Sequence, residues 1–196
     1  LGPGLPARRR SHPRTPPLHR ADATLRRFTD ELAPGRGMPA SPRATARQLG
    51  RMGADVVIAS RKAVNVEPAA RGLSAESGRD VLGVVCDVRD RVAVDALVAA
   101  TLTRFGRIDI LVNNGGGQFF SPAEALSARG WDAVVNTNLT GQWAVTQAVA
   151  NGWMLEHGGA IVNVTMLSHR GFPGMAHSVA ARAGIEALTR TVAVEW

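Results

Sequence analysis

The residues best suited to chemistry stand where an apolar run, Ile108 to Val112, ends in Asn113, Asn114 and three consecutive glycines. An unbroken run of aliphatic residues is typical of a parallel strand that is buried on both faces. In open α/β sheets ligands bind at the carboxyl ends of such strands, and glycine lets the backbone approach a bound molecule closely. The pattern therefore predicts a ligand-binding strand end, with a flexible turn as the simpler alternative.

Strand and helix patterns alternate along the chain and predict the elements that must position this strand end. The expected strands cover residues 55–59, 81–86, 108–112 and 160–165. The expected helices cover residues 41–53, 68–77, 91–105, 131–156 and 175–196. Strands that alternate with helices predict an α/β fold with a doubly wound, Rossmann-like parallel sheet.

Composition divides the chain into a basic tail and a nearly neutral body. Residues 1–40 are rich in proline, arginine and glycine and are expected to be a disordered tail, in which a short helix over residues 21–32 is possible. Residues 1–36 hold eight arginines against three acidic residues, and this accounts for most of the formal net charge of +7. Nucleic acid is therefore not an expected partner, and DNA binding through the tail is kept only as a third hypothesis.

The chain of 196 residues fits one domain, and its 45% hydrophobic residues are enough for a core, expected within residues 41–196. A single cysteine, Cys86, excludes an internal disulfide and suits a reducing compartment. No apolar run approaches the length that spans a membrane, and no secretory signal is evident. These features predict a cytoplasmic protein without a membrane partner, and no metal site is predicted.

The segments NNGGGQF, WDAVVNTNLTGQW, WMLEHGGAIVN and GFPGMAHSVAARAG resemble the short-chain dehydrogenase/reductase family. The resemblance extends from about residue 43 to residue 196 and is most specific for the branch of peroxisomal trans-2-enoyl-CoA reductases and their bacterial relatives. It implies a homo-oligomer that acts on a small acyl-CoA or carbonyl substrate. The implied reaction delivers hydride from NADPH to the β-carbon of a 2-enoyl thioester and a proton to the α-carbon.

The same resemblance implies a cofactor site for NADP. Arg61 matches an arginine that holds the 2′-phosphate of NADP, and Lys62 follows it, whereas an NAD-preferring site would carry an acidic residue nearby. A solvated turn arginine is the alternative interpretation of Arg61. Asp87 and Val88 match the pair beside adenine, although Asp87 could simply cap the following helix. The remaining cofactor-binding residues implied in this way are Asn113, Asn114, Gly115 and Gly116.

The catalytic positions of the family fall on unusual residues. Asn138 matches an asparagine that distorts its helix and holds a proton-relay water, although a merely packed asparagine is the alternative. The family's Tyr-x-x-x-Lys falls on Ser178 and Arg182. Its serine falls near Thr165 and Met166, where Thr165 or Ser168 could substitute for it. In the family the lysine lowers the pKa of the phenol, so that it exchanges a proton with the substrate. A serine hydroxyl is far too weak an acid for that role, and arginine does not share a proton.

The family's first strand and its Gly-rich turn have no counterpart in this sequence. Residues 35–42 read GRGMPASP in place of that turn, and residues 1–40 lack a strand of valine and isoleucine. We favour an out-of-frame or wrongly joined 5′ segment over an organelle transit peptide as the explanation. The predicted sheet is therefore incomplete, without its first strand and its C-terminal strands. Because the first strand occupies the centre of the sheet, the chain is expected to be poorly soluble or molten. A non-catalytic pseudoenzyme or fragment that packs with related subunits is the alternative to a reductase.

Overall fold

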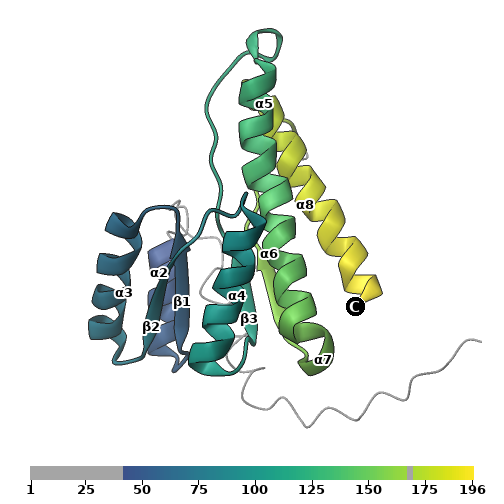
Figure 1. Ribbon diagram of the computed structural model, residues 1–196. Coiled ribbons are helices and arrows are strands. Elements are labelled where there is room, and N and C mark those ends of the chain that lie inside the picture. The colour runs from purple at the N-terminus through teal and green to yellow at the C-terminus, as the bar shows by residue number, and fades with distance from the viewer. Residues whose placement is uncertain (1–41, 167–169) are drawn as a thin grey trace, which may run out of the picture. The chain divides into compact units, whose positions relative to one another are not determined.

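A computed structural model describes residues 42–166 and 170–196, so the expected tail lies outside the described residues. The strands are β1 (Val56–Ser60), β2 (Val81–Val85), β3 (Ile110–Asn113) and β4 (Ala160–Asn163) (Figure 1). The separate helices are α2 (Pro42–Arg51), α3 (Ala63–Ser77), α4 (Arg91–Phe105), η1 (Ala123–Ala125) and α8 (Ala176–Glu195). One long continuous helix is built from α5 (Ala128–Val135), η2 (Asn136–Gly141), α6 (Gln142–Val149), η3 (Ala150–Met154) and α7 (Leu155–His157). The alternation of strands and helices confirms the predicted α/β class.

The strands form two separate parallel pairs. β1 pairs with β2 in a register that places Val56 opposite Val81, and β3 pairs with β4 so that Ile110 lies opposite Ala160. Within residues 42–166 and 170–196, no strand joins β1 to β3. The prediction of an incomplete sheet is therefore confirmed for the part of the chain that the structure describes.

Local sequence signals explain where the helices begin and end. The Asp90 side chain caps α4 by accepting a hydrogen bond from the backbone N–H of Val92 at 2.9 Å. Gly106 ends α4 in the left-handed conformation, with φ at 69°, which favours glycine. α3 begins five residues before Pro68, although proline predicted a start at that position. The long helix begins at Ala128 rather than residue 131, because the Ser127 hydroxyl caps it.

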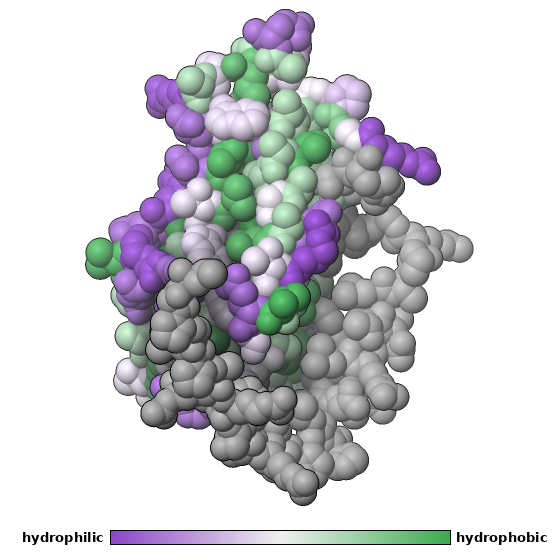
Figure 2. Space-filling view, turned by 90° about the vertical axis from the view of Figure 1, so that its right-hand side faces the viewer, coloured by the Kyte–Doolittle hydropathy of each residue, from purple (hydrophilic) through white to green (hydrophobic). Residues whose placement is uncertain are grey.

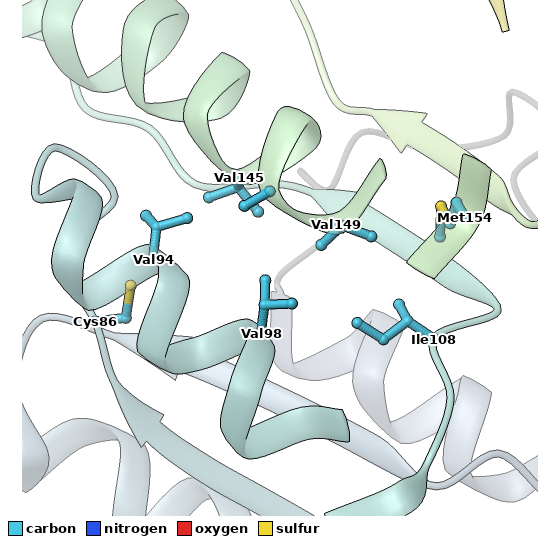
Figure 3. Packing of buried hydrophobic residues seen from close by; sticks show 8 residues of the cluster. Cys86, Val94, Val98, Ile108, Val145, Val149 and Met154 are labelled. Atoms are coloured by element: carbon cyan, nitrogen blue, oxygen red, sulfur yellow. The ribbon is translucent and has the colours of Figure 1, made fainter. Parts of the chain in front are cut away.

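The hydrophobic core also falls into two clusters. The larger one packs α4 against the long helix, and Figure 3 shows its buried side chains, which are Cys86, Val94, Val98, Ile108, Val145, Ala148, Val149 and Met154. The smaller one joins α2, β1 and α3 through Ala46, Val56 and Leu73. Burial raises the pKa of the Cys86 thiol, which lies just beyond β2 but packs in the larger cluster. The two halves of the sheet thus have separate cores, linked by the segment that follows β2.

None of the helices formed by the described residues has the length and hydropathy needed to cross a lipid bilayer.

Candidate active site

The carboxyl ends of β1 and β2 bring together the charged residues predicted to bind a cofactor. Arg61 and Lys62 follow β1 directly and are exposed, and Asp87 lies two residues beyond β2. Arg89 holds the Asp87 carboxylate through hydrogen bonds of 2.9 Å from Nε and 2.5 Å from Nη2. These bonds lower the pKa of Asp87 to about 2, and the nearby positive charge of Arg61 contributes to the same effect. The edge therefore carries two exposed cations beside a carboxylate that is already paired.

Val88 connects this edge to the long helix. A Cβ atom on Gly141 would lie 2.7 Å from Val88 Cγ2, so the glycine allows the loop after β2 to pack closely against η2. A cavity of about 660 Å³ opens beside this contact. Asp87 and Val88 line this cavity, together with side chains of the long helix such as Trp143, but none of the predicted catalytic residues does.

At the end of β3, the side chain of Asn113 is engaged within the protein. Its Nδ2 donates hydrogen bonds of 2.8 Å to Thr146 Oγ1 and 2.8 Å to Asn163 Oδ1. Asn163 lies opposite Asn113 in the register of β3 and β4, and its own Nδ2 donates to Thr189 Oγ1 at 2.9 Å. This chain of buried and half-buried polar groups ties α6, β3, β4 and α8 together at the strand ends.

The glycine run after β3 is fastened to the long helix. Asn138 is fully buried, and its amide both accepts from the Gly117 N–H and donates to the Gly117 carbonyl, each at 2.9 Å. Gln142 Nε2 donates to the Gly115 carbonyl at 2.7 Å, and half-buried Asn114 precedes that glycine. Asn138 lies within the π-helical segment η2.

Arg182 is a buried cation that packs against Gly116. Only 9% of the residue is exposed, its Nη1 donates to the Val164 carbonyl at 2.9 Å, and burial lowers the pKa of its guanidinium. A Cβ atom on Gly116 would overlap the guanidinium and lie 3.1 Å from Asn138 Oδ1. Among the described residues no carboxylate is paired with Arg182. The structure therefore places the side chains of Arg182 and Asn138 beside the same glycine, Gly116.

Ser178 is fully buried on α8, one helical turn before Arg182. Its hydroxyl lies 3.2 Å from Gln118 Oε1 and 3.5 Å from Met166 Sδ. The neighbouring His177 is also fully buried, and its ring meets Phe119 edge to face with centroids 4.6 Å apart. Neither side chain at this position presents a proton donor to solvent.

Thr165 lies apart from these groups. It is exposed, and its hydroxyl is 3.4 Å from Glu186 Oε1, one turn beyond Arg182 on α8. The alternative candidate, Ser168, falls outside the described residues. The cofactor-binding and catalytic roles of all the residues named in the sequence analysis stay predictions. Within residues 42–166 and 170–196, no group of three acidic, histidine or cysteine side chains could hold a metal ion.

Sequence reasoning missed Gln142 and Thr146, which hold the Gly115 carbonyl and the Asn113 amide. A signal for both was present, because Asn138, Gln142 and Thr146 repeat at intervals of four residues and so share one face of the helix. Polar side chains repeated along one helix face indicate groups that the helix can hold against a neighbouring segment.

Comparison with known proteins identifies the family. A family profile described as Enoyl-(Acyl carrier protein) reductase matches residues 42–196. The chain belongs to the short-chain dehydrogenase/reductase family. The resemblance stated from the sequence is thereby confirmed.

Two curated relatives illustrate the similarity. The peroxisomal 2,4-dienoyl-CoA reductase of Danio rerio is 39% identical over 152 residues, which are 77% of this chain and 51% of the relative. The probable 2,4-dienoyl-CoA reductase of Bacillus subtilis is 35% identical over 159 residues, or 79% of this chain and 61% of the relative. The chain thus spans about half the length of the peroxisomal relatives that it matches.

Solved structures of family members share the fold. The citronellol catabolism dehydrogenase of Pseudomonas aeruginosa is 44% identical with a TM-score of 0.74, and the match covers 79% of this chain and 63% of that protein. Similar structures include an NAD+-bound xylitol dehydrogenase and an actinorhodin polyketide ketoreductase with NADPH. A nicotinamide dinucleotide is therefore the cofactor of the family, in either its NAD or its NADP form.

Proposed function

We propose that this site is that of an NADPH-dependent reductase of 2-enoyl-CoA thioesters and that its chemistry is impaired in this chain. The observation that carries the proposal is the exposed pair Arg61 and Lys62 at the end of β1, beside Asp87. No acidic residue lies between Asp55 and Glu67, where an NAD-preferring site would place one against the ribose 2′-hydroxyl. Arginine forms strong bidentate hydrogen bonds with phosphate, and this chemistry favours the additional phosphate of NADP.

Similar proteins support a CoA thioester as the substrate. The relatives from Danio rerio and Bacillus subtilis are named as dienoyl-CoA reductases, and a Mycobacterium tuberculosis relative, 40% identical, is named as a carboxyl-CoA reductase. A gluconate 5-dehydrogenase of Gluconobacter oxydans is also similar, at 38% identity, so family membership alone does not select the substrate.

The residues present fit the adenosine half of the cofactor better than the reacting half. Arg61 and Lys62 would hold the 2′-phosphate, while Asp87 and Val88 would border the adenine ring. When bound, a nicotinamide dinucleotide supplies hydride. At the other end Ser178 is fully buried and Arg182 is turned onto Gly116, so neither of these two side chains stands ready to donate a proton. A positioned general acid contributes roughly 10²–10⁴-fold to rate, and we propose that these 196 residues alone bind the dinucleotide without measurable turnover.

A second candidate function is that of a non-catalytic subunit that packs with related subunits or with its own copies. Figure 2 shows apolar side chains gathered along the face on which α8 lies beside the long helix. Trp143 on the long helix stacks on Trp196 with ring centroids 6.2 Å apart, and Trp131, Val194 and Trp196 are exposed. Exposed apolar surface of this kind is typical of an interface between subunits.

Binding of NADPH and NADH to the chain and to Arg61→Ala, measured by fluorescence, tests the cofactor preference. We expect the substitution to weaken NADPH binding about tenfold, because it removes a charge-assisted hydrogen bond, and to leave NADH within about twofold. Arg71→Ala, an exposed arginine on α3, is the control and should change neither affinity. Equal losses for both nucleotides would contradict the NADP assignment.

NADPH oxidation in the presence of crotonyl-CoA tests the chemistry. We expect none from the isolated chain. Oxidation that depends on crotonyl-CoA and is abolished by Arg182→Ala would show that Ser178 and Arg182 work as a catalytic pair. Nucleotide binding without oxidation is the expected result in either case, so a stable oligomer in sedimentation is the result that would favour the non-catalytic candidate.

A further inference from the structure

Three phenylalanine side chains are exposed where the segments that follow β3 and β4 meet. Phe119 and Phe120 come directly after the glycine run, and Phe172 lies four residues before α8. Their exposed fractions are 44%, 72% and 47%, and the rings of Phe120 and Phe172 lie only 6.2 Å apart between centroids. Single exposed apolar residues are ordinary, but an exposed group of them marks a surface that binds something. We call these three residues the phenylalanine platform.

The backbone beneath the phenylalanine platform is held in place. The N–H of Ser121 donates to the Gly174 carbonyl at 3.0 Å and so joins the two segments. A Cβ atom on Gly174 would lie 3.3 Å from Phe120 Cδ1, so this ring lies directly against the glycine. The Phe119 ring reaches Gly130 in α5, where a Cβ atom would lie 2.8 Å from its Cζ. The rings therefore form a surface that exists before any ligand binds, as is usual for ligand sites.

The phenylalanine platform adjoins the predicted catalytic residues. Gln118, which directly precedes Phe119, accepts a hydrogen bond of 3.2 Å from the Ser178 hydroxyl. One residue earlier, Gly117 makes two hydrogen bonds with the side chain of Asn138. An apolar chain that lies on the platform would therefore extend from a reacting group placed beside Ser178 and Asn138.

The charges around the phenylalanine platform are compatible with an anionic ligand. Residues 114–123 and 170–185 contain no acidic residue. Arg170 is exposed two residues before Phe172, and in residues 42–166 and 170–196 no carboxylate pairs with it. Phenylalanine offers no hydrogen-bonding groups for a sugar or a peptide, whereas an exposed arginine binds phosphate well. A fatty acyl chain joined to a phosphate-bearing carrier matches both features.

We propose that the phenylalanine platform binds the acyl chain of a CoA thioester, so that this site favours medium-length and long acyl chains over short ones. The inference rests on the proposed function, since a CoA thioester is the substrate proposed there, and it adds where the acyl chain lies and how its length matters. A methylene that is fully buried increases affinity about fourfold. On an open surface about half of the methylene is covered, which corresponds to about twofold for each one.

Isothermal titration calorimetry of the chain with butyryl-CoA and octanoyl-CoA tests this dependence on chain length. Both thioesters are saturated, so they bind without being reduced. We expect octanoyl-CoA to bind about tenfold more tightly, and Phe120→Ala or Phe172→Ala to lower this ratio to about threefold or less. The matched control is Leu155→Ala, which removes an apolar side chain that is 51% exposed at the other end of the long helix. This control should leave the ratio unchanged.

Photochemical labelling adds a readout that does not depend on the folding of a variant. An octanoyl-CoA analogue with a diazirine at the end of its acyl chain should label residues 119–122 and 171–174 of the unaltered chain. Excess octanoyl-CoA should suppress this labelling, and the same concentration of butyryl-CoA should suppress it much less.

Four outcomes would overturn the proposal. Equal affinities for the two thioesters would mean that the acyl chain makes no contact. An equal effect of Leu155→Ala and Phe120→Ala, or labelling spread along the whole chain, would mean non-specific adsorption. Self-association that Phe120→Ala abolishes, without any effect of acyl length, would mean that a second copy covers the platform. Binding of neither thioester would also contradict the proposed substrate class.

Binding of NADPH, measured separately, distinguishes a failure of this inference from a failure of the proposed function. The platform variants should bind NADPH as the unaltered chain does. Loss of the dependence on acyl length with NADPH binding intact would overturn the platform alone. A chain that does not bind NADPH but keeps this dependence would contradict the proposed cofactor and support the platform.

Discussion

Substitution of Gly116 by alanine is expected to destabilise the half of the molecule that contains β3 and β4. A Cβ atom at this position would overlap the guanidinium of Arg182 and lie 3.1 Å from Asn138 Oδ1. Asn138 cannot move away easily, because its amide makes two hydrogen bonds with Gly117. Arg182 must therefore leave its position and lose its hydrogen bond to the Val164 carbonyl.

The magnitude follows from these two effects. Overpacking of a well-packed site costs about 1–3 kcal/mol. Loss of a hydrogen bond made by a buried charged group costs about 1.5–3 kcal/mol. Movement of Arg182 relieves the overpacking but breaks the hydrogen bond, so the two costs do not add fully. We therefore expect the free energy of unfolding to fall by about 2–4 kcal/mol. Lysine lacks the planar guanidinium group that overlaps the new methyl group. Combining Arg182→Lys with Gly116→Ala should therefore restore about 1 kcal/mol or more of the free energy of unfolding.

Urea unfolding followed by tryptophan fluorescence measures this change, because all four tryptophans lie on the long helix or at the end of α8. Gly115→Ala and Gly117→Ala are matched controls, since a Cβ atom at either position meets nothing within 4 Å. Both controls should stay within about 1 kcal/mol of the unchanged chain. Equal destabilisation by Gly115→Ala and Gly116→Ala would refute the contact between Gly116 and Arg182 as the cause.

Two further predictions concern cooperativity and pH. The two core clusters should unfold separately. Circular dichroism reports on both halves and should therefore begin to change at a lower urea concentration than tryptophan fluorescence. A single sharp transition in both signals would contradict this prediction and the expected molten character. The pKa of Asp87 is lowered from 3.8 to about 2 in the folded chain, so the folded state binds fewer protons between these values. Its contribution to stability is therefore present above about pH 4 and is lost as the pH falls toward 2. Urea titrations at several pH values should show that Asp87→Asn removes this part of the pH dependence, and an unchanged slope would rule out Asp87 as its source.

The sequence by itself was sufficient for the fold class and for the places of the strands. Apolar runs such as residues 108–112 and 160–165 predicted β3 and β4, because strands buried in a parallel sheet need aliphatic side chains on both faces. The absence of a strand between β1 and β3 among residues 42–166 and 170–196 could also be predicted, because no valine or isoleucine occurs before Val56. Two helix starts were predicted several residues late, because the hydroxyl cap of Ser127 and the tolerance of Pro68 inside α3 depend on local geometry.

Only the tertiary structure decided how deeply the site residues are buried and which partners their polar groups contact. Sequence reasoning placed Ser178 and Arg182 one turn apart on a helix, which follows from helical periodicity alone. It could not show that Ser178 is fully buried or that Arg182 turns onto Gly116. Likewise, the partners of Asn113 depend on the register of β3 against β4 and on the packing of α6. Contacts between residues distant in sequence are set by the packing of whole helices and strands, and a local pattern carries no information about that packing.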